Sequence, residues 1–221
     1  MILYKYRSLK NLDHILGIFV HSRLYCARYL EMNDPFEGLF SATIHISPQE
    51  RAKFPFFTLP DSFSVTKSVN DLFHSSKDRI RICSLSSSMS DVRLWSHYAD
   101  GNRGIVLEID FSGLENVIHE VNYSDKLPSY GYTILTAPNP IEVLTQKTTH
   151  WSYESEFRII HETEFFDIQE RMRAIYVGSR VSKTHLEFLD KMKPSKIPII
   201  HTDIDPKSIK VRIKRSDELA L

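Results

Sequence analysis

Ile105-Val106-Leu107-Glu108-Ile109-Asp110 is the stretch that decides the fold class. Positions 105, 107 and 109 alternate with positions 106, 108 and 110, and this period of two is typical of a β-strand. The segment 117–123 has a similar pattern and follows after a short connection. Short connections join antiparallel strands, because parallel strands need a long crossover. We therefore expect 117–123 to be the hairpin partner of 105–110 in an antiparallel sheet.

Further strands and helices extend outward from this hairpin in both directions. Gly17 is suited to the left-handed position that ends the first helix, and a later helix is expected to run from Pro140 to His150. Helix N-caps are expected at Ser8, Asp91, Asn139 and Ser182. Strands are expected at 2–6, 24–30, 80–85, 156–161, 174–178, 197–201 and 209–213. The fold class is therefore α+β, with a mostly antiparallel β-sheet core and flanking helices.

Trp151 is expected at the junction between the helix that starts at Pro140 and the strand 156–161. Its spacing from Ile141 and Leu144 puts these side chains near one helix face. We therefore expect Trp151 to be a buried anchor of the core.

The chain is expected to form a single domain over residues 1–221. Its length of 221 residues lies within the range of one mixed domain, and its 13 Phe and 10 Tyr supply apolar area for a core. The segment at about 46–77 has poor periodicity and contains Pro48, Pro55 and Pro60. We expect an irregular insertion there, with one helix near 68–74.

Charge and targeting signals limit the classes of partner. Lys plus Arg and Asp plus Glu both number 28, so the field of the whole protein is not that of a nucleic-acid or anionic-membrane binder. The N-terminus lacks the apolar run of a signal peptide, and no stretch reaches the roughly 20 apolar residues that span a bilayer. We expect a cytoplasmic protein without a membrane partner.

The cysteines give no sign of a disulfide framework or of a structural zinc site. Cys26 and Cys83 each lie in a strand-like run and have no metal-ligand spacing. We expect both to be buried free thiols.

Short polar and aromatic strings carry the functional signal, because the common P-loop, GxGxxG, GxSxG and HExxH motifs are absent from the sequence. The strings are Tyr4-Lys5-Tyr6-Arg7, Asn33-Asp34-Pro35-Phe36-Glu37, Cys83-Ser84-Leu85-Ser86, Leu94-Trp95-Ser96-His97-Tyr98-Ala99 and 151–158, WSYESEFR. In this order they resemble a widespread bacterial family of proteins of unknown function with YKYR, NDPFE, LWxHYA and WxYExEFR motifs. The resemblance covers about residues 3–177 and singles out Asn33, Asp34 and Glu37 as a further polar motif.

The order of these strings also resembles the ADP-ribosyltransferase fold. That fold has a split β-sheet with an Arg or His on an early strand, a hydroxyl or aromatic residue on a middle strand and a Glu-x-Glu or lone Glu at a late strand. The resemblance implies NAD as a substrate, no metal, and a macromolecular acceptor that is a protein or a nucleic acid. It also implies a role as a toxin or phage-defence effector, with an antitoxin or regulatory partner.

The resemblance assigns a role to each matching residue. Arg7, beside Tyr6, would hold NAD, since a guanidinium forks onto phosphate or ribose oxygens. Glu156 would stabilise the oxocarbenium-like sugar formed when nicotinamide leaves, and Glu154 would orient or deprotonate the acceptor from the same side of the strand. Ser84 or Ser86 would position the ribose or the glutamate, and Trp95 with Tyr98 would form a flat wall for nicotinamide.

Other interpretations stay open. Arg7 is equally explained by an ion pair with Glu37 or Glu154, and the Glu-x-Glu pair by solvent-facing strand carboxylates with Arg158 on the same face. Trp95 and Tyr98 have the helical spacing of core residues. A metal-dependent phosphodiesterase would use Asp34, Glu37, Glu154 and Glu156 as ligands, and a non-catalytic module would use the same cleft to bind a ligand or a partner.

Overall fold

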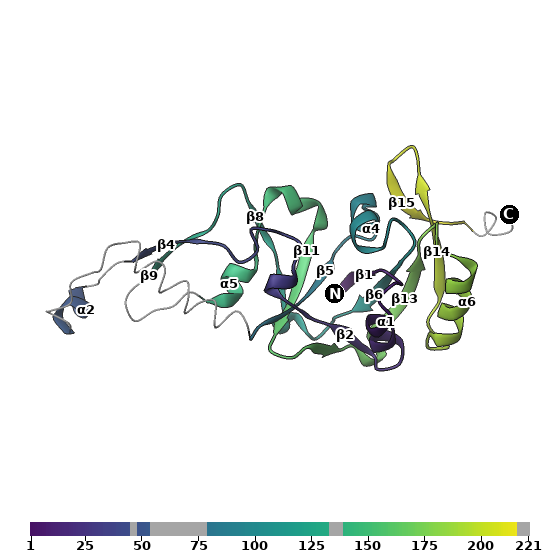
Figure 1. Cartoon of the computed structure of the whole chain (residues 1–221), viewed down its shortest axis with the longest axis horizontal. Coiled ribbons are helices and arrows are strands. Elements are labelled where there is room, and N and C mark those ends of the chain that lie inside the picture. The colour runs from purple at the N-terminus through teal and green to yellow at the C-terminus, as the bar shows by residue number, and fades with distance from the viewer. Residues whose placement is uncertain (45–47, 54–78, 133–138, 216–221) are drawn as a thin grey trace.

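The computed structural model describes residues 1–44, 48–53, 79–132 and 139–215, and its core is one open, mixed sheet (Figure 1). The strand order is β15-β14-β13-β6-β1-β5-β11-β7, and β3 pairs with β5 beside this path. All described pairings in this sheet are antiparallel except that of β13 with β14. The strands are β1 (Ile2–Arg7), β3 (Ala27–Arg28), β5 (Arg81–Ser86), β6 (Ile105–Asp110), β7 (Ile118–Glu120), β11 (Glu156–His161), β13 (Met172–Val177), β14 (Ile199–Asp205) and β15 (Lys210–Ile213). The expected α+β class with a mostly antiparallel sheet is confirmed.

The sheet consists of two halves that meet at a single register pair. Every residue of β1 pairs with β6, and every residue of β5 pairs with β11. Between β1 and β5, by contrast, the one register pair is Tyr4 with Ser86. The two central strands therefore diverge after Tyr4.

Helices cover both faces of this sheet. Ile15 and Ile18 of α1 (Leu12–Phe19) and Leu189 of α6 (Lys183–Met192) are buried in a core with Leu107 of β6. On the other face, Trp95 of α4 (Val92–Tyr98) is buried with the strand residues Tyr6 and Val106. The sheet is thus a middle layer, and α4 and α1 lie on opposite sides of it (Figure 1).

The N-caps of the helices are mostly where the sequence predicts them. Asp91 and Ser182 cap α4 and α6 with their side chains, as expected. The first helix begins later than expected, because Asn11 and not Ser8 accepts a hydrogen bond from the backbone N–H of His14. Gly17 is a buried residue inside α1, so its role as the helix terminator is wrong.

The segment after Asn139 differs most from the expectation. Asn139 caps α5 (Pro140–Leu144) as predicted, but the helix ends well before His150. The next residues form β10 (Gln146–Thr148), which pairs in parallel with β8 (Asn122–Ser124), and then the 3₁₀ helix η3 (Thr149–Glu154). Trp151 is therefore half-buried in η3 and does not share a helix face with α5, which corrects the predicted anchor.

The predicted hairpin partner of 105–110 is also wrong. β7 pairs with β11, whereas β6 lies between β1 and β13. The expected strand 24–30 is divided into β2 (Arg23–Tyr25), β3 and the 3₁₀ helix η1 (Tyr29–Glu31), and β2 pairs with β12 (Phe165–Asp167). Two further 3₁₀ helices are η2 (Glu115–Val117) and η4 (Gln169–Arg171).

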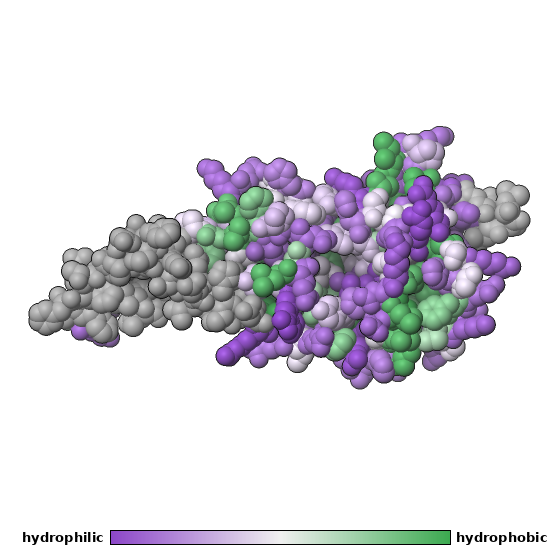
Figure 2. Space-filling model, viewed as in Figure 1, coloured by the Kyte–Doolittle hydropathy of each residue, from purple (hydrophilic) through white to green (hydrophobic). Residues whose placement is uncertain are grey.

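The described part of the chain around the expected insertion lies at the opposite end of the molecule from α6 (Figure 1). It contains α2 (Pro48–Lys53) and the parallel pair of β4 (Ser41–Ile44) with β9 (Ser129–Tyr132). The expected helix near 68–74 lies outside the described residues. Figure 2 shows a largely hydrophilic face with hydrophobic residues in separate groups. No helix in the described ranges is long and apolar enough to cross a membrane.

Candidate functional site

A cavity of about 380 Å³ opens where β1 and β5 diverge. It is lined by residues from every one of the polar and aromatic strings, although these are far apart in the sequence. The lining residues from the strings are Tyr4, Lys5, Tyr6, Arg7, Asn33, Ser84, Leu85, Ser86, Leu94, His97, Tyr98, Glu154 and Glu156. The divergence of the half-sheets thus gathers the motif residues around one space.

Lys5 and Arg7 give this cavity a positive wall that has no carboxylate partner in the described part of the chain. Lys5 Nζ donates to the carbonyl oxygen of Ser84 at 2.6 Å, and Arg7 donates to the carbonyl oxygen of Tyr25 at 3.2 Å. Arg7 Nε is buried and has no hydrogen-bond partner. Neither cation is in a salt bridge with a carboxylate of the described part of the chain. Burial lowers the pKa of both groups, and the charge of Arg7 lowers the pKa of Lys5 further.

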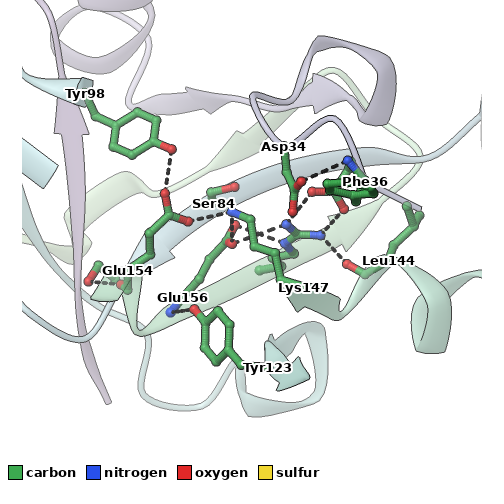
Figure 3. Close-up of polar contacts among 12 residues, drawn as sticks. Asp34, Phe36, Ser84, Tyr98, Tyr123, Leu144, Lys147, Glu154 and Glu156 are labelled. Atoms are coloured by element: carbon green, nitrogen blue, oxygen red, sulfur yellow. Dashed lines mark hydrogen bonds and ion pairs between the residues drawn. The ribbon is translucent and has the colours of Figure 1, made fainter. Parts of the chain in front are cut away.

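Glu156 lies in a network of buried charges beside the cavity (Figure 3). Arg158 donates to Glu156 at 3.0 and 3.2 Å and to both carboxylate oxygens of Glu37 at 2.6 and 2.8 Å. Lys147 Nζ donates to Glu156 at 2.9 Å, and the backbone N–H of Glu156 donates to the hydroxyl of Tyr123 at 2.9 Å. Burial disfavours the charged form, but Arg158 and Lys147 outweigh burial and lower the pKa of Glu156 to about 2. Glu156 is therefore held in its ionised form, and both of its carboxylate oxygens already accept hydrogen bonds from Arg158 or Lys147.

Glu154 has a different environment from Glu156. Its carboxylate accepts hydrogen bonds from the Tyr98 hydroxyl at 2.6 Å and from Lys147 Nζ at 2.5 Å (Figure 3). Its carbonyl oxygen accepts from the hydroxyl of Ser86 at 2.6 Å. Burial raises the pKa of Glu154, Lys147 opposes this, and the charge of Glu156 adds to it. Of the two carboxyl groups, Glu154 therefore has the higher pKa.

The positions of Glu154 and Glu156 differ from the extended pair that the sequence predicts. Glu154 is the last residue of η3, and Ser155 has a left-handed backbone with φ of 42°. Only Glu156 lies on a strand. The two carboxylates nevertheless line the same cavity, and both bind Lys147.

Most of the predicted site residues line the cavity. Arg7, Tyr6, Ser84, Ser86, Tyr98, Glu154, Glu156 and Asn33 all do so. The hydroxyl of Tyr6 donates to the carbonyl of Ser88 at 2.8 Å. The alternative in which Arg7 pairs with Glu37 or Glu154 is wrong, because Arg158 and Lys147 are the partners of those acids.

Trp95 is the main exception among the predicted binding residues. Its ring is fully buried in the core, and its indole N–H donates to the carbonyl of Met89 at 2.8 Å. It does not line the cavity, so the predicted wall of Trp95 and Tyr98 retains only Tyr98. A stacked pair offers another flat surface there, with the rings of His14 and Tyr25 4.6 Å apart and inclined by 20°.

The Asn33–Glu37 string contributes mainly to the buried charge network around Arg158, and only its Asn33 lines the cavity. Asp34 is buried and accepts a hydrogen bond from the backbone N–H of Phe36 at 2.9 Å, which shapes the turn that delivers Glu37 to Arg158. In the described ranges no group of three His, Cys, Asp or Glu is arranged to hold a metal. Glu37, Glu154 and Glu156 are bonded to cations, so this donor set gives the metal-dependent alternative no support.

Lys5, Lys147, His14 and Tyr25 are among the cavity residues that sequence reasoning did not select. Lys5 is part of the Tyr-Lys-Tyr-Arg string, where alternation would turn it away from Tyr4 and Tyr6. Lys147 was expected inside a helix. The two β-branched residues Thr148 and Thr149 that follow it are the sequence signal that would have favoured a strand there.

No family model, curated protein or solved structure matches this chain.

Proposed function

We propose that this protein is an NAD-consuming, ADP-ribosyltransferase-like enzyme that modifies a macromolecular acceptor. The observation that carries the proposal is that one cavity has both a cationic wall and a carboxylate. Lys5 and Arg7 lack a carboxylate partner among the described residues, and Glu154 lines the same space. A dinucleotide has matching parts, since its diphosphate is anionic and its nicotinamide ribose becomes cationic when the glycosidic bond breaks.

The cation wall suits the diphosphate. A guanidinium presents several N–H donors in a fixed fork, and an ammonium acts as a compact point charge, so the two complement each other on phosphate oxygens. Arg7 Nε is already buried without a partner, and a phosphate oxygen would satisfy it. Binding an anion there would also remove the repulsion between Lys5 and Arg7.

Glu154 is the better candidate for the reacting carboxylate, and Glu156 is a positioning residue. In the reaction, the bond from C1′ of the ribose to the nicotinamide nitrogen breaks and its electron pair neutralises the pyridinium. An ionised Glu154 would stabilise the positive charge that develops on the sugar. The acceptor nucleophile would then bond to C1′ and release its proton to Glu154. Glu156 would keep Lys147 beside Glu154, and Tyr98 would hold the carboxylate in place.

The aromatic rings supply surfaces for the planar parts of NAD. Tyr98 lies beside Glu154, whereas the His14–Tyr25 stack lies near Arg7, whose guanidinium bonds the Tyr25 carbonyl. Planar rings stack well on aromatic faces. We assign Tyr98 to nicotinamide and the His14–Tyr25 stack to adenine.

The test combines NAD titration calorimetry with an assay of nicotinamide release, each with and without cell lysate as a source of acceptor. Glu154→Gln should bind NAD within a few-fold of wild type and lose at least about 100-fold of turnover, because it removes charge and proton acceptor but keeps shape. Glu162→Gln is the matched control, since Glu162 is exposed, and it should retain full activity. Absence of NAD binding and of nicotinamide release in wild type sinks the proposal.

NAD binding without nicotinamide release under either condition would favour the non-catalytic alternative. The same cavity would then be a sensor or a recognition site for a dinucleotide. The Glu154→Gln variant distinguishes the two, because it would leave a purely binding role intact.

A further inference from the structure

Cys26, the residue directly before β3, and Cys83 of β5 lie next to each other behind the wall of the cavity, with their thiols within hydrogen-bond reach. β3 and β5 pair antiparallel with Ala27 opposite Ile82, and one step further along this register brings Cys26 opposite Cys83. The backbone N–H of Cys26 donates to the carbonyl of Glu164 at 2.8 Å and so points away from β5. The cysteines therefore form a non-hydrogen-bonded pair, the geometry in which opposite Cα atoms are about 4.5 Å apart. That separation lies within the disulfide range of roughly 4.4–6.8 Å.

The surroundings of the two thiols differ: the hydrogen bond with Cys83 and burial raise the pKa of Cys26, whereas the groups around Cys83 favour its thiolate. His161 Nε2 lies 3.1 Å from Cys26 Sγ. The backbone N–H of Thr163 donates to His161 Nδ1, so the neutral ring carries its hydrogen on Nε2 and donates it to the sulfur. Cys83, in contrast, experiences the positive charges of Lys5 and Arg7. A thiol hydrogen bond with Cys26 and these two cations lower the pKa of Cys83, against the effect of burial.

We propose that Cys26 and Cys83 form a peroxide-sensitive thiol pair that closes to a reversible disulfide and thereby tightens anion binding in the adjoining cavity. The oxidant is a hydroperoxide. Cys83 thiolate attacks a peroxide oxygen, the O–O bond breaks, and the departing hydroxide takes up the proton that Cys83 released. Cys26 sulfur then attacks the sulfenic sulfur of Cys83, an S–S bond forms, and hydroxide leaves with the Cys26 proton as water. In total, one hydrogen peroxide is reduced to two waters and two thiols are oxidised to one disulfide.

The link to the cavity is electrostatic. Lys5 and Arg7 have no carboxylate partner among the described residues, and the negative charge of the Cys83 thiolate raises the pKa of both and so offsets part of their positive charge. A disulfide carries no charge. Oxidation therefore removes the negative charge of Cys83 from beside Lys5 and Arg7. These two cations then attract an anion in the cavity more strongly. In reducing compartments such pairs are transient and serve as sensors rather than as structural bridges.

The first measurement is the intact mass of the full chain after hydrogen peroxide, with and without dithiothreitol. We expect the loss of two hydrogens, a peptide map that links Cys26 to Cys83 in a monomer, and full reversal by dithiothreitol. Cys26→Ser should instead stop with one added oxygen on Cys83. Oxygen adducts without a cross-link in the wild type, or a link only between two chains, would overturn the proposal.

The second measurement is calorimetric titration with inorganic pyrophosphate of the reduced and the oxidised protein. We expect severalfold tighter binding after oxidation, and no such change in the Cys26→Ser/Cys83→Ser double variant. Equal affinity in the two redox states would remove the link to the cavity. Because neither measurement uses NAD or an acceptor, their outcome is separate from that of the NAD assay.

Discussion

Arg158 joins Glu37 of a turn to Glu156 of β11 and also donates to the carbonyl of Leu144. It is fully buried and makes no contact with the solvent that could replace these partners. The network it forms therefore depends on a single side chain to hold separate segments together.

Substituting Arg158→Met should lower the free energy of unfolding by about 3–5 kcal/mol, because it leaves the buried carboxylate of Glu37 without its cation and leaves Glu156 with Lys147 alone. Urea unfolding measures the change. Arg173→Met is the matched control, since Arg173 binds Asp110 with half of its side chain exposed and should cost at most about 1 kcal/mol. Similar costs for the two variants would contradict the role of Arg158. Adding Glu37→Gln and Glu156→Gln to Arg158→Met should recover part of the loss.

The pH dependence of stability should report on Glu156. Its pKa in the folded protein is about 2, below its ordinary value of 4.5, so the unfolded chain binds more protons between these values. The stability that Glu156 contributes is present above about pH 4.5 and is lost as the pH falls toward 2. Urea unfolding at a series of pH values should show this loss in wild type and a shallower slope in Glu156→Gln. Glu154→Gln should keep the slope, because the pKa of Glu154 is shifted upward; an unchanged slope in Glu156→Gln would refute the assignment.

At the level of the elements, the two tryptophans exchange the roles that their sequence context suggests. Trp95 was expected at a ligand wall but is fully buried in α4, and Trp151 was expected in the core but is half-buried in η3. Lys147 Nζ lies 4.9 Å from the centre of the Trp151 ring, so this tryptophan shields the Lys147–Glu154 pair.

Trp95→Ala should therefore cost about 3–5 kcal/mol of unfolding free energy through cavity formation and the orphaned carbonyl of Met89. Trp151→Ala should cost roughly 1–2 kcal/mol, mostly from the lost cation–π contact and partial burial. Denaturant midpoints of the two variants give the comparison. The reverse order of costs would mean that η3, not α4, holds the core together.

Local signals in the sequence were sufficient for much of this architecture. Alternation located β6 and β11, and the side-chain caps Asp91, Asn139 and Ser182 located the starts of α4, α5 and α6. Strand partners were not accessible in the same way, because pairing depends on contacts between distant segments. The parallel pairing of β10 with β8 ended the Pro140 helix early and brought Lys147 to Glu154. The motif strings could be recognised as a group, but only the divergence of β1 from β5 explains why Lys5 belongs to the site.

On the scale of the whole molecule, the cavity imposes a cost that a ligand should relieve. Lys5 and Arg7 are held together without a carboxylate between them in the described chain, and burial disfavours both charges. A site of this kind is stabilised by the anion that it binds, since the anion binds the folded state and not the unfolded chain.

Inorganic pyrophosphate at 100 times its dissociation constant should raise the free energy of unfolding by about 2.7 kcal/mol. The double variant Lys5→Met/Arg7→Met should lose this effect and should be at least as stable as wild type without ligand, because it removes two unpaired charges. Thermal unfolding with and without pyrophosphate measures both. A double variant that is still stabilised by pyrophosphate would place the anion elsewhere. Lys210→Met is a control, since Lys210 is exposed on β15.

The pairing of β1 with β5 through one register pair also affects how the sheet resists mechanical force. Six register pairs join β1 to β6 and six join β5 to β11, whereas Tyr4 with Ser86 is the one register pair between the two central strands. A force that pulls the sheet apart along its hydrogen bonds meets the fewest bonds at this seam, so the seam yields before either half unravels. A ligand bound to both Arg7 and Glu154 would connect the two halves of the sheet across this seam. It would therefore strengthen the sheet at the place where the backbone pairing is weakest.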